Sequence, residues 1–216
     1  MSRDGTRAAV LNNQQLASFL RIAMQHRLGP ALWLTAMTGM RRGEVIALRW
    51  SDVDIDACRL SVRRSATCTG YRVHVTPTKT PTSRRTIDVD EGTVAVLVQW
   101  RAVQAAELTS DGAPHVFTDN SGRMLHPHLL SQTFERLQVR AGLPRIRLHD
   151  LRHTHATLLL KEGVPAKVVS ERLGHANVAF TMAVYKHVLP GIQRDAATLF
   201  ARLVTGDGHM VPVDGP

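Results

Sequence analysis

The stretch RLHDLRHTHATLLL, residues 147–160, contains histidines and arginines at spacings that allow their side chains to form a binding or catalytic site together. On a helix, His149, Arg152 and His153 share one face, because they lie three and four residues apart. Two histidines at this spacing can bind zinc, but a zinc site needs a third protein ligand, and Arg152 between them would repel a cation. An anion is the better ligand, because a guanidinium donates to two phosphate oxygens and a helix start favours negative charge. The cluster therefore predicts a phosphate-binding face and no metal.

The neighbouring face of the same helix is apolar. Leu148, Leu151 and Leu158 share this face with His155. We therefore predict that His155 is a histidine of the protein core.

Three other segments carry residues of the same chemical kind. They are TGMRRGEVIALRW (38–50), TKTPTSRRTIDV (78–89) and LGHANVAFTMAVYKHVLPG (173–191). Alone, each has an ordinary explanation, with Arg41 as a surface arginine, Lys79 as a loop lysine and Tyr185 as a core residue. All four segments, in this order and spacing, resemble the catalytic domain of tyrosine recombinases, the phage integrase family. The resemblance covers residues 10–202.

The resemblance implies a complete catalytic set, consisting of Arg41, Lys79, His149, Arg152, His175 and Tyr185. In this family a tyrosine oxygen attacks a DNA phosphorus without metal or other cofactor, and leaves a 3′-phosphotyrosyl link and a free 5′-hydroxyl. The resemblance makes Tyr185 the nucleophile and Lys79 the general acid for the leaving oxygen. Glu44 is expected either to orient Arg41 or to cap a helix start, and His153 to support the helix packing or the site from behind.

Cleavage without a metal makes demands that these residue types meet. A five-coordinate phosphorus gathers negative charge on its oxygens, and fixed cations must then carry that charge. Arg41 and Arg152 are suited to this, because arginine stays charged at any working pH and binds two oxygens at once. His149 and His175 can add hydrogen bonds, and one of them can help to deprotonate the phenol.

The composition favours a phosphate-bearing partner. The 216 residues include 27 Lys and Arg against 18 Asp and Glu, which gives a net charge of +9. Several arginines in the predicted sheet and before the catalytic helix are expected to follow the DNA backbone, with ordinary solvated charge as the alternative for each. These are Arg63, Arg64, Arg72, Arg84, Arg85, Arg145 and Arg147.

The elements that must position these residues are mostly helices. The predicted fold class is α+β, mainly helical: a tyrosine-recombinase catalytic fold with a small three-stranded antiparallel sheet. Alternation of apolar and polar residues between 58 and 90 predicts that sheet as a meander of three consecutive strands. Helical periodicity is predicted for 11–29, 30–38, 43–50, 92–108, 126–142, 148–163, 164–174, 178–189 and 191–204.

One catalytic domain is expected at 11–203, between a leader at 1–10 and a disordered tail at 204–216. The N-terminal DNA-gripping domain of full-length relatives is expected to be absent. Two other functions stay open, which are a topoisomerase-like nicking and resealing activity and a non-catalytic helix-turn-helix at 164–187.

The expected partners are double-stranded DNA, other copies of the chain on DNA and an accessory DNA-bending or directionality protein. No membrane is expected, because no apolar run approaches the ~20 residues that a membrane helix needs. The two cysteines, Cys58 and Cys68, have neither metal nor redox spacing, so a reduced bacterial cytoplasm is the expected location.

Overall fold

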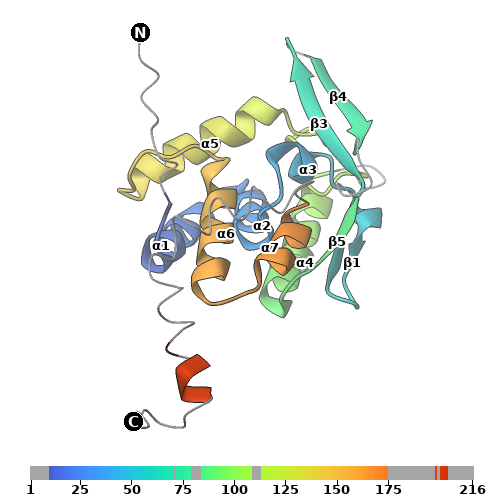
Figure 1. The fold of residues 1–216 in the computed structure, drawn as a ribbon. Coiled ribbons are helices and arrows are strands. Elements are labelled where there is room, and N and C mark those ends of the chain that lie inside the picture. The colour runs from blue at the N-terminus through green and yellow to red at the C-terminus, as the bar shows by residue number, and fades with distance from the viewer. Residues whose placement is uncertain are drawn as a thin grey trace, which may run out of the picture.

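The computed structural model describes residues 10–70, 72–78, 84–108, 113–174, 198 and 200–203. Helices dominate this part of the chain and a small set of strands lies between them, so the predicted α+β, mainly helical class is confirmed (Figure 1). The helices are α1 (Asn13–Ala23), α2 (Gly29–Thr38), α3 (Arg42–Ile46), α4 (Glu91–Glu107), α5 (Pro127–Arg140), α6 (Asp150–Lys161) and α7 (Ala166–Leu173). The strands are β1 (Val53–Asp54), β2 (Arg59–Val62), β3 (Arg64–Thr69), β4 (Arg72–Pro77) and β5 (Arg85–Asp88), and a 3-10 turn, η1 (Trp50–Asp52), precedes β1.

Local sequence signals fix where the first helices begin and end. The Asn12 side chain accepts a hydrogen bond from the Gln15 N–H, and Gln15 returns one to the Asn12 N–H, which is a capping box. Pro30 lies in the first turn of α2, where its missing N–H costs nothing. Gly39 ends α2 in the left-handed region, at φ 64°, a conformation that strongly favours glycine. Both predicted helices are present, but the first, expected over 11–29, ends at Ala23, and turns lead from there to α2.

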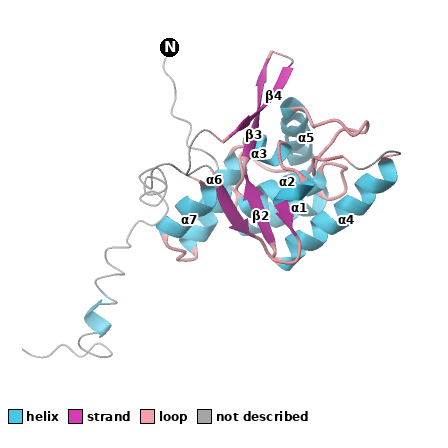
Figure 2. Cartoon of the chain, turned by 90° about the vertical axis from the view of Figure 1, so that its right-hand side faces the viewer, coloured by secondary structure: helices cyan, strands magenta, loops and turns pink. Residues whose placement is uncertain are grey.

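Helix α2 is the central element of the fold. It packs against α1, α3, α4, α5 and α6, and the views in Figures 1 and 2 both place it inside the ring of helices. Leu32 and Leu34 on this helix are fully buried. Phe19 and Phe134 meet edge to face in the same core, with ring centroids 5.2 Å apart. The ends of this rigid helix therefore give fixed positions to whatever they carry.

The predicted sheet is present, but its strand order differs from the meander expected for 58–90. A three-stranded antiparallel sheet has the order β1-β2-β5, and β3 and β4 form a separate antiparallel hairpin. The segment predicted as one first strand is divided between β2 and β3, and its partner changes there. Val62 pairs with Arg85 of β5, whereas Arg64 pairs with Pro77 of β4.

Pro77 explains part of this change of partner. Proline has no N–H to donate, so β4 ends there, with one last hydrogen bond from the Thr78 N–H to the Arg63 carbonyl. The hairpin then projects away from the helices in both views (Figures 1 and 2). Alternation of apolar and polar residues predicts that a segment is extended but does not say which neighbour it pairs with.

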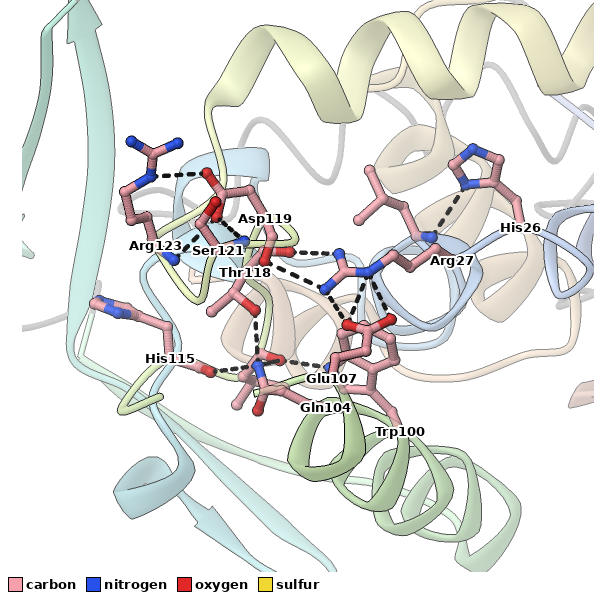
Figure 3. A network of polar contacts seen from close by, with 12 residues as sticks. His26, Arg27, Trp100, Gln104, Glu107, His115, Thr118, Asp119, Ser121 and Arg123 are labelled. Carbon is pink, nitrogen blue, oxygen red and sulfur yellow. Dashed lines mark hydrogen bonds and ion pairs between the residues drawn. The ribbon is translucent and has the colours of Figure 1, made fainter. Parts of the chain in front are cut away.

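A polar network connects the turn after α1 with the end of α4 and with residues 118–119 (Figure 3). Arg27 donates to the Glu107 carboxylate at the end of α4 and to the carbonyls of Thr118 and Asp119. Its guanidinium also lies over the ring of Trp100, 5.0 Å from the centroid. One side chain thus links three segments that are distant in sequence. None of the helices in the described ranges has the length and apolar character needed to cross a membrane.

Candidate active site

Arg41 stands at the N-terminal end of α3, and Glu44 fixes both its backbone and its side chain. The Arg41 N–H donates to Glu44 Oε2 over 2.8 Å, and Arg41 Nη1 donates to Glu44 Oε1 over 2.9 Å. Glu44 is 2% exposed, while the Arg41 side chain keeps 38% of its surface accessible. Both roles considered for Glu44, capping the helix and orienting Arg41, are therefore compatible with its position.

Arg152 lies in the first turn of α6 and is buried, with 3% of its surface exposed. Its Nη1 donates to the carbonyl of Gly39 and its Nη2 to the carbonyl of Leu173, each over 2.7 Å. Burial and then the positive charge of Arg41 lower the pKa of Arg152 to about 9, which leaves the group protonated at neutral pH. The two carbonyls fix the plane of its guanidinium.

The C-terminal end of α7 brings three arginines together. Three successive carbonyls accept from them: Arg172 O from Arg85 Nε at 2.8 Å, Leu173 O from Arg152 Nη2 at 2.7 Å, and Gly174 O from Arg41 Nη2 at 3.0 Å. These carbonyls have no partners within a helix and form its negative end, so guanidiniums are favourable there. Arg41 and Arg152, from motifs far apart in sequence, are thus held side by side.

Gly174 is suited to this crowded position. It ends α7 in the left-handed region, at φ 66°. A Cβ atom at this position would lie 2.8 Å from Nη1 of Arg85. A larger residue would therefore strain the backbone and displace an arginine.

His149 lies at the start of α6, beside the two arginines. It lines a cavity of about 570 Å³ together with Arg41 and Arg147. Its ring meets that of His153 edge to face at 5.1 Å. Partial burial, and then the positive charges of His153 and Arg152, lower the pKa of His149. A neutral imidazole at this position can exchange a proton near neutral pH.

His155 packs between α2 and α7, as predicted for an internal histidine. Its Nδ1 lies 3.0 Å from the carbonyl of Ala36, and its Nε2 lies 3.2 Å from Nε of Arg172. Because arginine can only donate, Nε2 must be the unprotonated nitrogen and Nδ1 the donor to Ala36. The histidine thereby anchors Arg172, one of the residues whose carbonyls form the end of α7.

Acid should weaken the fold through His155. Burial and then the charge of Arg172 lower its pKa to about 4, whereas the ring titrates near 6.5 in an unfolded chain. The stabilisation is fully present above pH 6.5 and is lost as the pH falls towards 4. Between pH 7 and 4.5, we expect the free energy of unfolding of the wild type to fall by about 2–3 kcal/mol more than that of His155→Gln.

Urea unfolding at both pH values measures this difference. His74→Gln, at an exposed position on β4, is the matched control and should behave as the wild type does. Equal losses in the wild type and His155→Gln would contradict the assignment.

The arginines predicted to follow DNA lie in different environments. Arg63, Arg64 and Arg84 line a cavity of about 760 Å³ between the two sheets, and Arg147 lines the cavity beside His149. Arg72 and Arg145 are exposed. Arg85 also lines the inter-sheet cavity, but it differs from the expectation because its side chain is only 6% exposed and donates to Glu44. Strand alternation distinguishes it from its neighbour Arg84, because Arg85 shares a face of β5 with the buried Ile87.

Lys79, His175 and Tyr185 lie outside the described residues, and so does the predicted helix at 178–189. His175 directly follows Gly174 in the sequence. Within the described ranges, no three His, Cys, Asp or Glu side chains are grouped to hold a metal ion.

The fold and the arginine cluster define a class of protein, and comparison with known families identifies it. The phage integrase family matches residues 10–191 of the chain. The chain therefore belongs to this family, whose members include the tyrosine recombinases.

Particular relatives agree with this assignment. A tyrosine recombinase XerC-like protein of Caldanaerobacter subterraneus subsp. tengcongensis is 31% identical over 202 residues, covering 86% of this chain and 52% of the relative. The ICEBs1 integrase of Bacillus subtilis is 31% identical over 168 residues, covering 74% and 45%. A solved structure of the Tn1549 transposon integrase with transposon right end DNA has a TM-score of 0.80, with 21% identity and coverage of 95% and 69%. The chain spans about half the length of the curated relatives that it matches.

Proposed function

We propose that the chain catalyses site-specific DNA recombination for a phage or other mobile element, by metal-free phosphoryl transfer through a 3′-phosphotyrosyl intermediate. The observation that carries this proposal is the pairing of Arg41 and Arg152 on successive carbonyls of α7, beside the cavity that His149 lines. Two fixed guanidiniums beside a cavity suit a phosphate that gathers negative charge during reaction.

The proposed reaction assigns a task to each group. The Tyr185 oxygen attacks the phosphorus, the 5′-oxygen departs, and Lys79 gives it a proton. Arg41 and Arg152 hold the non-bridging oxygens, while His149 and His175 add hydrogen bonds and help to move the phenol proton. The covalent link preserves the energy of the broken bond, so a hydroxyl of another strand can reverse the step without ATP.

Double-stranded DNA is the proposed substrate, and the Tn1549 integrase was solved in complex with transposon right end DNA. The DNA backbone would be contacted, without sequence reading, by Arg63, Arg64, Arg72, Arg84, Arg145 and Arg147. Other copies of the chain on the same DNA, an accessory protein and a location in the bacterial cytoplasm are part of this proposal.

Covalent capture tests the proposal without knowledge of the target site. The full chain is incubated with a pool of labelled duplexes that have a random core and a nick close to the position of cleavage. After cleavage, the short fragment beside the nick diffuses away, so the 3′ link cannot be reversed. We expect a denaturant-resistant protein–DNA band, and the trapped DNA, once sequenced, gives the target.

Chelation separates the proposed chemistry from a metal-dependent one. Adduct formation should be unchanged in excess EDTA, because arginines rather than Mg²⁺ carry the charge. No adduct with any duplex of the pool would contradict the enzyme and favour a DNA-binding module. Relaxation of plasmids without exchange between two captured sites would instead indicate a topoisomerase-like activity.

A further inference from the structure

One carboxylate serves two arginines behind the active site. Arg85 donates from Nη1 to Glu44 Oε1 over 3.1 Å and from Nη2 to Oε2 over 2.9 Å, so it binds the carboxylate with both arms. Arg41 Nη1 donates to the same Oε1 over 2.9 Å. Arg85 lies on β5 and also donates to the carbonyl of Arg172, which holds it in place.

The charges of this group do not cancel. Arg41 and Arg85 bind the carboxylate of Glu44, and the guanidinium of Arg152 is close enough for its charge to interact with it. These three guanidiniums and one carboxylate leave two positive charges. Burial by itself would raise the pKa of Glu44, but Arg85 and then Arg41 hold it below its usual value, so the carboxylate stays ionised. In a buried group, where water screens little, each of these charges acts strongly on the others.

The negative charge of Glu44 opposes the positive charge of Arg41, and Arg85 compensates it. A carboxylate is a good support for Arg41, because it fixes both the side chain and the backbone of that residue. A lone carboxylate would also cancel much of the positive charge that Arg41 presents to a phosphate. The guanidinium of Arg85, bound to both oxygens of the same carboxylate, compensates its negative charge.

We propose that Arg85 is a positioning residue that neutralises Glu44, so that Glu44 orients Arg41 without cancelling the charge that Arg41 presents to the scissile phosphate. This role rests on the proposed function. The proposed role applies to Arg85 and not to its exposed neighbour Arg84. For Arg85, it replaces the DNA-backbone contact that was expected from the sequence.

The test measures adduct formation in single turnovers, with protein in excess over the captured duplex. Arg85→Gln should slow the step about 100-fold and change the dissociation constant for DNA by less than about threefold, because the loss falls on the transition state. Arg85→Lys keeps the charge and should stay within about tenfold of the wild type. Arg59→Gln is the matched control, since it removes an arginine–carboxylate pair of the same sheet that is exposed (57% and 74%).

The decisive readout is the effect of Glu44→Gln in two backgrounds. In the wild type, this substitution should slow adduct formation, because Arg41 loses its charged support. In Arg85→Gln, it should speed the step about fivefold or more, because the carboxylate that opposes Arg41 is gone. A purely structural contact predicts further loss in the double variant, so a double variant no faster than Arg85→Gln would overturn the proposal.

Thermal melting shows whether each variant folds, which a comparison of reaction rates requires. Where Arg85→Gln does not fold, Arg85→Lys decides, and a folded Arg85→Lys slowed as much as about 100-fold would overturn the charge role. Failure of the proposed function and failure of the role of Arg85 give different results. A wild-type chain without adduct removes the proposed function and this role together, whereas an active wild type with an equally active Arg85→Gln contradicts only the role of Arg85.

Discussion

The variant Tyr185→Phe is expected to form no covalent adduct with the captured duplex, while its dissociation constant for that duplex stays within about threefold of the wild-type value. Phenylalanine keeps the ring and its packing but lacks the oxygen that attacks phosphorus. The covalent step should therefore fall by more than about 10⁴-fold, since loss of a nucleophile removes the route itself. Denaturing gels detect the adduct, and a mobility shift measures the affinity.

The phenol also explains why the site needs positive charge. A free tyrosine has a pKa of about 10, so only about one molecule in a thousand is ionised at neutral pH. Neighbouring guanidiniums favour the phenolate and hold the phosphate that it attacks. Tyr185 is one of two tyrosines in the chain, so Tyr71→Phe is a matched control and should leave the adduct unchanged. An adduct of normal yield from Tyr185→Phe would give the nucleophile to another residue.

Much of the fold could be predicted because its signals are local. The Asn12 cap, Pro30 in a first turn and Gly39 after a last turn each act within a few residues, and the helices follow them. Spacing along one helix likewise predicted that His149 and Arg152 lie together. In the structure the Arg152 N–H donates to the His149 carbonyl one turn earlier, and the charge of Arg152 lowers the pKa of His149.

What the sequence could not predict depends on contacts between distant segments. The partner of β2 is β5 rather than the next strand along the chain, and alternation does not encode that choice. Arg84 and Arg85 are adjacent and chemically identical in the sequence, yet one is exposed and the other is 6% exposed beside Glu44. Alternation places Arg85 on the face of β5 that carries the buried Ile87. It does not predict the partners of Arg85, Glu44 and the carbonyl of Arg172, which come from α3 and α7.

The backbone of α7 supplies a part of the site that no motif predicts. Every residue has a backbone carbonyl, so the sequence does not show which carbonyls contribute to a site. The three that bind Arg85, Arg152 and Arg41 could therefore not be predicted from residue types. They orient the arginines as a set, because successive carbonyls of one helix end have fixed relative positions. A substitution that alters one arginine should therefore affect geometry as well as charge.

Arg152→Lys tests that consequence and is expected to slow adduct formation about 10³-fold, although the positive charge is kept. Lysine is a point charge on a flexible stem and cannot donate in one plane to Gly39 O and Leu173 O while also facing a phosphate. The free energy of unfolding should fall by about 1–3 kcal/mol, because at least one buried carbonyl loses its donor. Single-turnover adduct formation and urea unfolding measure the two effects.

Arg140→Lys is the control for the same chemical change at an exposed helix end, where arginine donates to Gln25 over a long 3.4 Å. This variant should match the wild type in both measurements, because a loosely held surface charge contributes little. An Arg152→Lys variant as fast as the wild type would show that charge alone suffices at this position. In that case the carbonyls of Gly39 and Leu173 would serve the fold and not the alignment of the reacting phosphate.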